Sequence, residues 1–200
     1  MALPGQRNNL FRQLHAAGWI AYEAAPAFDS ALAVREPGPL PLLWFGLYAA
    51  PEAIELPAAA QALPAGWQSG LPPGAYAGAF NRIKRHIRDG DTYQVNFTGR
   101  LWQERFTADP WQAFLVLVQA QRATCGAYVS AGPWRICSAS PELFFRLDGD
   151  RIESRPMKGT APRGRSAAQD QAQAEALRAC EKNRAENLMI VDMVRNDLGR

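Results

Sequence analysis

The order of the apolar patterns after residue 73 limits the fold of this chain more than any other feature. A helical stripe over 76–87, with apolar residues spaced 4, 3 and 4 apart, precedes a strand-like alternation over 93–98. Asp109-Pro110 then predicts the start of a helix that runs to about residue 121. From Ala167 onward the sequence favours helix throughout. Between these two helical regions lie three strand-like segments, at 127–130, 134–138 and 143–147. Because strands and helices do not alternate one for one, the pattern predicts an α+β fold.

The segment from Pro51 to Pro73 interrupts this regularity. It contains five prolines and two glycines, a composition that is typical of a long surface connection. We therefore expect a boundary here, between an N-terminal region at 1–70 and a second region at 71–200. The preceding apolar run, 39–50, is shorter than the ~20 residues of a membrane span, and we interpret it as a strand buried on both faces.

Composition excludes several classes of function. Twenty-two Lys and Arg against 19 Asp and Glu give a net charge of only +3, too small to imply a polyanion as partner. Cations along the 76–88 helix are explained by a solvated outer face, so no nucleic acid partner is expected. Three cysteines and two histidines form no zinc pattern or disulfide framework, which favours a reducing, cytoplasmic setting.

Glu142 is the first candidate functional residue. It follows Ser140-Pro141 and precedes the apolar triplet at 143–145. A carboxyl group beside so much apolar surface is expected to have a raised pKa, because desolvation disfavours its charged form. A general acid needs such a pKa near neutral pH. A solvated glutamate at a strand edge is the alternative interpretation.

Lys158 is the second candidate, in a turn with a proline two residues before it and a glycine directly after it. A lysine on such a turn can point into a cleft. Its neutral amine is a nucleophile if burial or nearby cations, such as Arg155 and Arg163, depress its pKa. An ordinary surface lysine is the alternative. Arg163 and Arg165 in the following loop suit an anionic substrate or serve solubility.

Glu186 is the third candidate. The segment 188–194 is apolar nearly all round a helix, so this helix is expected to be buried. Glu186 shares one face with three of those apolar residues. A carboxylate that points toward a core must be paired, protonated or bound to a metal, and Mg²⁺ prefers carboxylate oxygens. A buried salt bridge to Arg184 or Arg195 explains the same residue.

Four motifs, in order along the chain, resemble those of the chorismate-utilising enzymes. Residues 90–98 are similar to the signature that opens their catalytic domain, and residues 138–144 resemble their Ser-Pro-Glu strand. Residues 155–164 resemble their central turn, and residues 181–200 resemble the helix that supplies a magnesium ligand. Four such matches in order identify the chain, by resemblance, as a member of this family.

The family resemblance implies an anthranilate synthase component I-like fold, a large α+β sandwich of two β-sheets with helices outside. The catalytic domain of the family continues well beyond Arg200. We therefore expect this chain to be a fragment or a truncated gene product that is inactive alone. In this interpretation 1–70 is an N-terminal region, and 71–200 is the first half of the catalytic domain.

Lysine at position 158 resembles the branch of the family that aminates chorismate at C4; anthranilate-forming members usually carry alanine there. The resemblance implies that Lys158 attacks C2 of chorismate while Glu142 protonates the departing C4 hydroxyl. Ammonia then adds at C4, giving 4-amino-4-deoxychorismate for 4-aminobenzoate and folate synthesis. It also implies Gly159 and Thr160 as substrate-binding residues and Glu186 as a Mg²⁺ ligand.

The resemblance also implies a glutamine amidotransferase subunit that supplies the ammonia. Asn183 stands where the family usually has aspartate, which we expect to be tolerated because the metal ligand is assigned to Glu186. Another chorismate-utilising enzyme, forming anthranilate or isochorismate and salicylate, is the second hypothesis. The third is a non-catalytic remnant that acts as a binding module.

Overall fold

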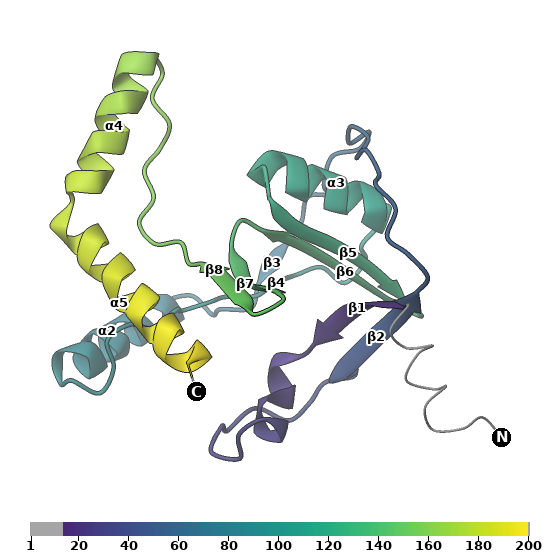
Figure 1. Ribbon diagram of the computed structural model, residues 1–200, viewed down its shortest axis with the longest axis horizontal. Helices are drawn as coiled ribbons and strands as arrows, with labels where there is room; N and C mark the ends of the chain where they lie inside the picture. The colour runs from purple at the N-terminus through teal and green to yellow at the C-terminus, as the bar shows by residue number, and fades with distance from the viewer. Residues whose placement is uncertain (1–13, 200) are drawn as a thin grey trace. The chain divides into compact units, whose positions relative to one another are not determined.

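The computed structural model describes residues 14–199 (Figure 1). Helices are mixed with strands, and the described strands pair antiparallel in four two-stranded sheets. This combination confirms the predicted α+β class. The chain forms two compact units, one made of the residues up to Leu56 with those from Leu117 onward, and the other of Pro57–Val116.

The first sheet pairs β1 (His15–Ile20) with β2 (Leu43–Tyr48). A short 3-10 helix, η1 (Tyr22–Ala27), follows β1. Trp19 stands opposite Trp44, and their stacked ring centroids lie 5.1 Å apart. The strand expected within 39–50 is thus confirmed as β2. The prediction that this strand is buried on both faces is wrong, because leucines on β2 are up to 58% exposed. The sheet has only two strands among the described residues, so much of β2 stays open to solvent.

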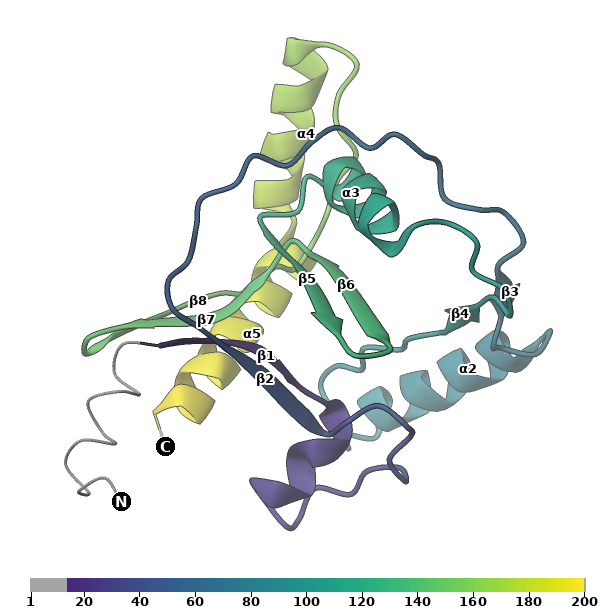
Figure 2. The same ribbon diagram turned by 90° about the vertical axis from the view of Figure 1, so that its right-hand side faces the viewer.

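Two hairpins follow in the same unit (Figure 2). The first joins β5 (Cys125–Ala131) to β6 (Trp134–Ser140), and the second joins β7 (Leu143–Asp148) to β8 (Arg151–Arg155). Gly149, with a φ of +60°, provides the left-handed turn of the second hairpin. The three strands expected between 127 and 147 are therefore confirmed as β5, β6 and β7.

Two helices complete this unit, α4 (Ala167–Ala179) and α5 (Glu181–Leu198). Figure 1 shows the connection from β8 to α4 as a long segment without regular structure. The expected burial of the second helix is wrong for the described residues, because Ile190 is buried but Leu188 is 71% exposed. The apolar pattern indicates a helix that is able to pack on all sides, whereas these residues cover only part of it.

The second unit contains α2 (Ala75–Arg88) and a short sheet of β3 (Gln68–Ser69) with β4 (Leu101–Trp102). The strand expected at 93–98 is wrong, since these residues form no strand and Tyr93 is 81% exposed. Alternation alone cannot form a strand, because its backbone groups need a partner edge. No strand within 14–199 supplies one here.

Helix α3 (Pro110–Gln121) runs from one unit into the other. The predicted cap is confirmed, since Gln112 N donates to Asp109 Oδ1 at 2.9 Å. The best-buried side chains gather on this helix, where Leu115 is fully buried and Phe114 is 5% exposed. No helix within 14–199 is both long and apolar enough to cross a bilayer.

We expect residues 1–200, prepared alone, to self-associate. Phe144 on β7 is 77% exposed and Leu188 on α5 is 71% exposed, and large apolar patches on a protein surface favour association. Light scattering during size-exclusion chromatography should give a mass above the 22.0 kDa of the chain. Replacing Phe144 and Leu188 together by serine should reduce the association. A monodisperse monomer that melts cooperatively would contradict this prediction.

Candidate functional site

Glu142 lies directly before β7, in a turn that its neighbour closes. Ser140 Oγ accepts a hydrogen bond from Glu142 N at 3.2 Å and donates one to Glu142 O at 3.0 Å. The half-buried Glu142 side chain reaches the segment after β8, where its Oε1 accepts a hydrogen bond from Met157 N at 2.8 Å. One carboxylate therefore joins the β6–β7 turn to the backbone of Met157, the residue directly before Lys158.

Lys158 is half-buried and lies in a segment, 156–165, that has no helix or strand. The next residue, Gly159, has a φ of +57°, a left-handed conformation that glycine adopts without steric cost. A Cβ atom at Gly159 would stand 2.8 Å from Asn183 Cγ. The lysine segment therefore packs its backbone directly against the first turn of α5.

Glu186 follows Asn183 by three residues, so the two lie on the same face of α5. The Glu186 side chain is 33% exposed, and its Oε1 lies 3.8 Å from Lys182 Nζ. The alternative prediction, an ion pair of Glu186 with Arg184 or Arg195, is wrong, because Glu186 pairs with Lys182. Arg195 instead pairs with Asp192 at 2.8 Å.

The three predicted segments are linked by two contacts. Glu142 accepts a hydrogen bond from the N–H of Met157, the residue before Lys158, and Gly159 packs on α5 one helical turn before Glu186. Thr160, the other predicted substrate-binding residue, is exposed. Within 14–199 no three His, Cys, Asp or Glu side chains are grouped so that they could hold a metal ion. Glu186 therefore offers a single carboxylate donor.

The two arginines expected to act on Lys158 each have a carboxylate partner. Arg155 Nε lies 2.7 Å from Glu153 Oε1, and this hydrogen bond lowers the pKa of Glu153. Arg163 donates two hydrogen bonds to Asp170, at 2.7 and 2.6 Å. These bonds lower the pKa of Asp170 and raise that of Arg163.

The depressed pKa of Asp170 sets the pH range of its contribution to stability. A carboxyl group whose folded-state pKa is lowered stabilises the fold above its ordinary pKa, which for aspartate is about 3.9. This contribution is lost as the pH falls through the lower folded-state value.

Asp170 is not among the candidate residues predicted from the sequence. The Ser166-x-x-Gln169 capping pattern beside it nevertheless marks the start of the helix that positions it.

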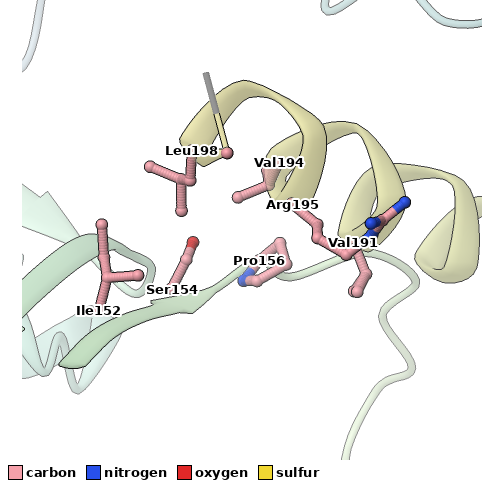
Figure 3. A pocket seen from close by; sticks show the side chains of 8 residues that line it. Ile152, Ser154, Pro156, Val191, Val194, Arg195 and Leu198 are labelled. Carbon is pink, nitrogen blue, oxygen red and sulfur yellow. The ribbon is translucent and has the colours of Figure 1, made fainter. Parts of the chain in front are cut away.

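A cavity of about 410 Å³ lies between β8 and the C-terminal half of α5 (Figure 3). Its lining is mostly apolar and consists of Ile152, Ser154, Pro156, Val191, Val194, Arg195, Leu198 and Gly199. Glu142, Lys158 and Glu186 are not among these residues. The cavity is therefore an apolar space that adjoins the start of the lysine segment, and it lacks the convergent polar groups of a ligand site.

Lys158 is thus half-buried, and its two neighbours in the chain make the contacts, Met157 with Glu142 and Gly159 with Asn183 of α5. Residues 49–200 match the chorismate binding enzyme family. The chain belongs to this family, which confirms the predicted resemblance.

Particular relatives narrow the comparison. The chain is 43% identical over 134 residues to aminodeoxychorismate synthase component 1 of Escherichia coli, a match that covers 67% of this chain and 29% of the relative. It is 39% identical over 163 residues to the protein of the same name from Klebsiella aerogenes, covering 80% and 34%. Anthranilate synthase component 1 1 of Haloarcula marismortui is 40% identical over 126 residues, covering 63% and 26%. The chain thus spans 26% to 34% of the length of these relatives.

Substitution of Gly159 should reveal the contact with α5. Gly159→Ala is expected to lower the free energy of unfolding by about 2 to 4 kcal/mol, because it adds both backbone strain and a clash with Asn183. Gly149→Ala is the matched control, since its φ of +60° is similar but nothing lies within 4 Å of the added Cβ. It should cost about 1 kcal/mol.

Urea denaturation of the full-length protein measures both changes. In the Gly159→Ala background, Asn183→Ala should recover the steric part of the loss and leave the backbone strain. Equal losses for the two glycine variants would mean that Gly159 and Asn183 do not meet.

Proposed function

We propose that this chain is the N-terminal part of an aminodeoxychorismate synthase component I, which converts chorismate and ammonia to 4-amino-4-deoxychorismate. The product serves 4-aminobenzoate and folate synthesis. The observation that carries the proposal is the lysine segment, in which Lys158 lies half-buried between the Glu142 contact and the Gly159 contact. Relatives with this name, 39% and 43% identical to the chain, support it.

In the proposed reaction the neutral amine of Lys158 attacks C2 of chorismate. A C–N bond forms at C2 while the ring double bonds shift and the C4–O bond breaks. Glu142 donates a proton to the departing hydroxyl, which leaves as water. Ammonia then forms a bond to C4, the double bonds shift back, and the C2–N bond breaks, so that Lys158 leaves as a neutral amine. The Glu142 carboxylate takes the surplus proton from the new C4 ammonium group, which restores the acid.

The contact with Met157 suits both parts of this chemistry. Because Oε1 of Glu142 accepts the Met157 N–H, the proton is assigned to Oε2, which can donate while the contact persists. The same hydrogen bond holds the backbone one residue before Lys158. This bond limits the movement of the Lys158 backbone relative to the proposed acid, which supports positioned catalysis. Gly159 and Thr160 follow directly and would contact the substrate.

Mg²⁺ is part of the proposal, with Glu186 as its ligand. The carboxylate is only one-third exposed, and its 3.8 Å contact with Lys182 is the kind of surface pair that contributes little to stability. Protein sites often hold Mg²⁺ by one or two carboxylates together with water and substrate oxygens, so a single donor from this segment fits. When bound, the metal would neutralise anionic oxygens of the substrate.

The proposed whole enzyme takes ammonia from a glutamine amidotransferase partner, in keeping with the words "component 1" in the names of its relatives. We place it in the cytoplasm, where thiols such as the three cysteines of the chain persist. Its complete fold would be the two-sheet sandwich, with 1–70 as N-terminal region and 71–200 as the first half of the catalytic domain.

Product analysis tests the proposal. The full-length protein, incubated with chorismate, Mg²⁺ and ammonium, should form 4-amino-4-deoxychorismate. Anthranilate as the product would overturn this assignment and support the second candidate, which the Haloarcula relative favours. Absence of any turnover, together with chorismate binding, would favour a non-catalytic binding module.

Lys158 variants test the covalent step. Lys158→Arg keeps the positive charge but is effectively never deprotonated, and Lys158→Ala loses both charge and amine. Both should lose most 4-amino-4-deoxychorismate formation. With chorismate but no ammonia, intact-protein mass spectrometry should show an adduct on the wild type and none on either variant. Substantial activity of Lys158→Arg beside an inactive Lys158→Ala would instead indicate a purely electrostatic role.

Glu186 variants test the metal ligand. Glu186→Gln should weaken Mg²⁺ binding at least about tenfold, because a neutral amide replaces a hard anionic donor. Lys182→Gln is the matched control, since it breaks the same ion pair and keeps the carboxylate. Isothermal titration of Mg²⁺ in the presence of chorismate gives both affinities. If both variants bind Mg²⁺ like the wild type, Glu186 serves only the ion pair.

A further inference from the structure

The first turn of α4 binds the end of the lysine segment through one carboxylate. Asp170 accepts hydrogen bonds from Arg163 Nε at 2.7 Å and from Arg163 Nη2 at 2.6 Å. Its Oδ1 also accepts the backbone N–H of Gly164 at 2.9 Å. A side chain and a backbone amide of successive residues are thus attached to one residue of the helix.

The neighbouring contacts leave this attachment little freedom. A Cβ atom at Gly164 would stand only 2.1 Å from Asp170 N, so the backbone lies directly on the helix start. Arg165 N donates to Gln169 Oε1 at 3.0 Å, and Ser166 Oγ caps the helix by accepting from Gln169 N at 3.3 Å. The carboxylate of Asp170 is 31% exposed, whereas the Arg163 side chain is 82% exposed. Asp170 is therefore the better-buried half of the pair.

Only three residues separate this attachment from the one at α5. Gly159 packs against Asn183, and 160–162 then lead to Arg163. Proline at position 162 restricts this short span further. The backbone of Thr160, which is exposed, is thereby held from both sides although no helix or strand contains it.

We propose that Asp170 is a positioning residue that fixes 160–162 and, through this span, the substrate-contacting backbone of Gly159 and Thr160. This inference rests on the proposed function, because it gives Asp170 a role in chorismate binding. An aspartate is charged at neutral pH, and the hydrogen bonds from Arg163 lower the pKa of Asp170 further, so the attachment also persists at mildly acidic pH.

Steady-state kinetics of the full-length enzyme test the inference. Asp170→Ala should raise the KM for chorismate about tenfold and change kcat by less than about threefold, because it loosens a binding surface and leaves Lys158 and Glu142 in place. The KM of Asp170→Asn should lie between those of the wild type and Asp170→Ala. Its amide oxygen can still accept from Gly164 N and Arg163 Nε, but the negative charge and the bond from Arg163 Nη2 are lost. Glu175→Ala is the control, because it removes another carboxylate of α4, one that contacts Gln171, and should leave both constants unchanged.

If Asp170 only stabilised the fold, its loss should change kcat and leave the KM for chorismate unchanged. Partial unfolding would lower the active fraction, and hence kcat, at an unchanged KM. Such a result, or kinetics of both Asp170 variants equal to those of Glu175→Ala, would overturn the inference.

Hydrogen exchange of the full-length protein separates this inference from the proposed function. Asp170→Ala should speed amide exchange throughout 159–165, whereas Glu175→Ala should not. If the wild type forms anthranilate, the function fails but the change in KM still decides the role of Asp170. If the wild type turns over no chorismate, faster exchange confined to 159–165 supports the positioning role. Exchange like that of the control overturns it.

Discussion

The hydrogen bond from Met157 N to the Glu142 carboxylate is the contact on which the arrangement of the site depends. Hairpin β7–β8 returns the chain to the level of Glu142, since Leu143 stands opposite Arg155 in the antiparallel register. Two residues after Arg155 the strand pairing has ended, and the Glu142 carboxylate accepts the hydrogen bond of the Met157 amide in place of a strand partner. Without it, nothing in the ladder would carry the position of the strands into the lysine segment.

A segment without helix or strand keeps its place here through single contacts at separate points. Fixing each residue of such a segment costs about 1 to 2 kcal/mol of backbone entropy, which regular hydrogen bonding does not repay. Three different devices offset this cost. Glu142 accepts an amide, Gly159 allows close packing on α5, and Asp170 binds both Arg163 and the backbone of Gly164. Each of these contacts requires a particular residue type at its position.

Features that depend on neighbouring residues were predicted well from the sequence, and features that depend on tertiary contacts were predicted less well. The Asp109 cap and the apolar pattern of 143–147 depend on residues within a few positions, so helix α3 and strand β7 could be predicted from the sequence. The strand at 93–98 could not, because a strand also needs a partner edge that a pattern does not reveal. The partner of Glu186 was missed for a similar reason. Ion pairs depend on side-chain direction. Lys182 lies one turn earlier on the same face of the helix and pairs with Glu186, in place of either arginine.

The charge balance around Lys158 bears on how its amine is made reactive in the proposed reaction. Arg155 before it is paired with Glu153, and Arg163 after it is paired with Asp170, so each cation stands beside a compensating anion. Two neutral pairs exert a weaker field on a nearby amine than two unpaired arginines. Lys158 itself is half-buried. This burial lasts only while the loop around Lys158 is held, so in the proposed reaction the Glu142 and Gly159 contacts would serve the chemistry as well as the fold.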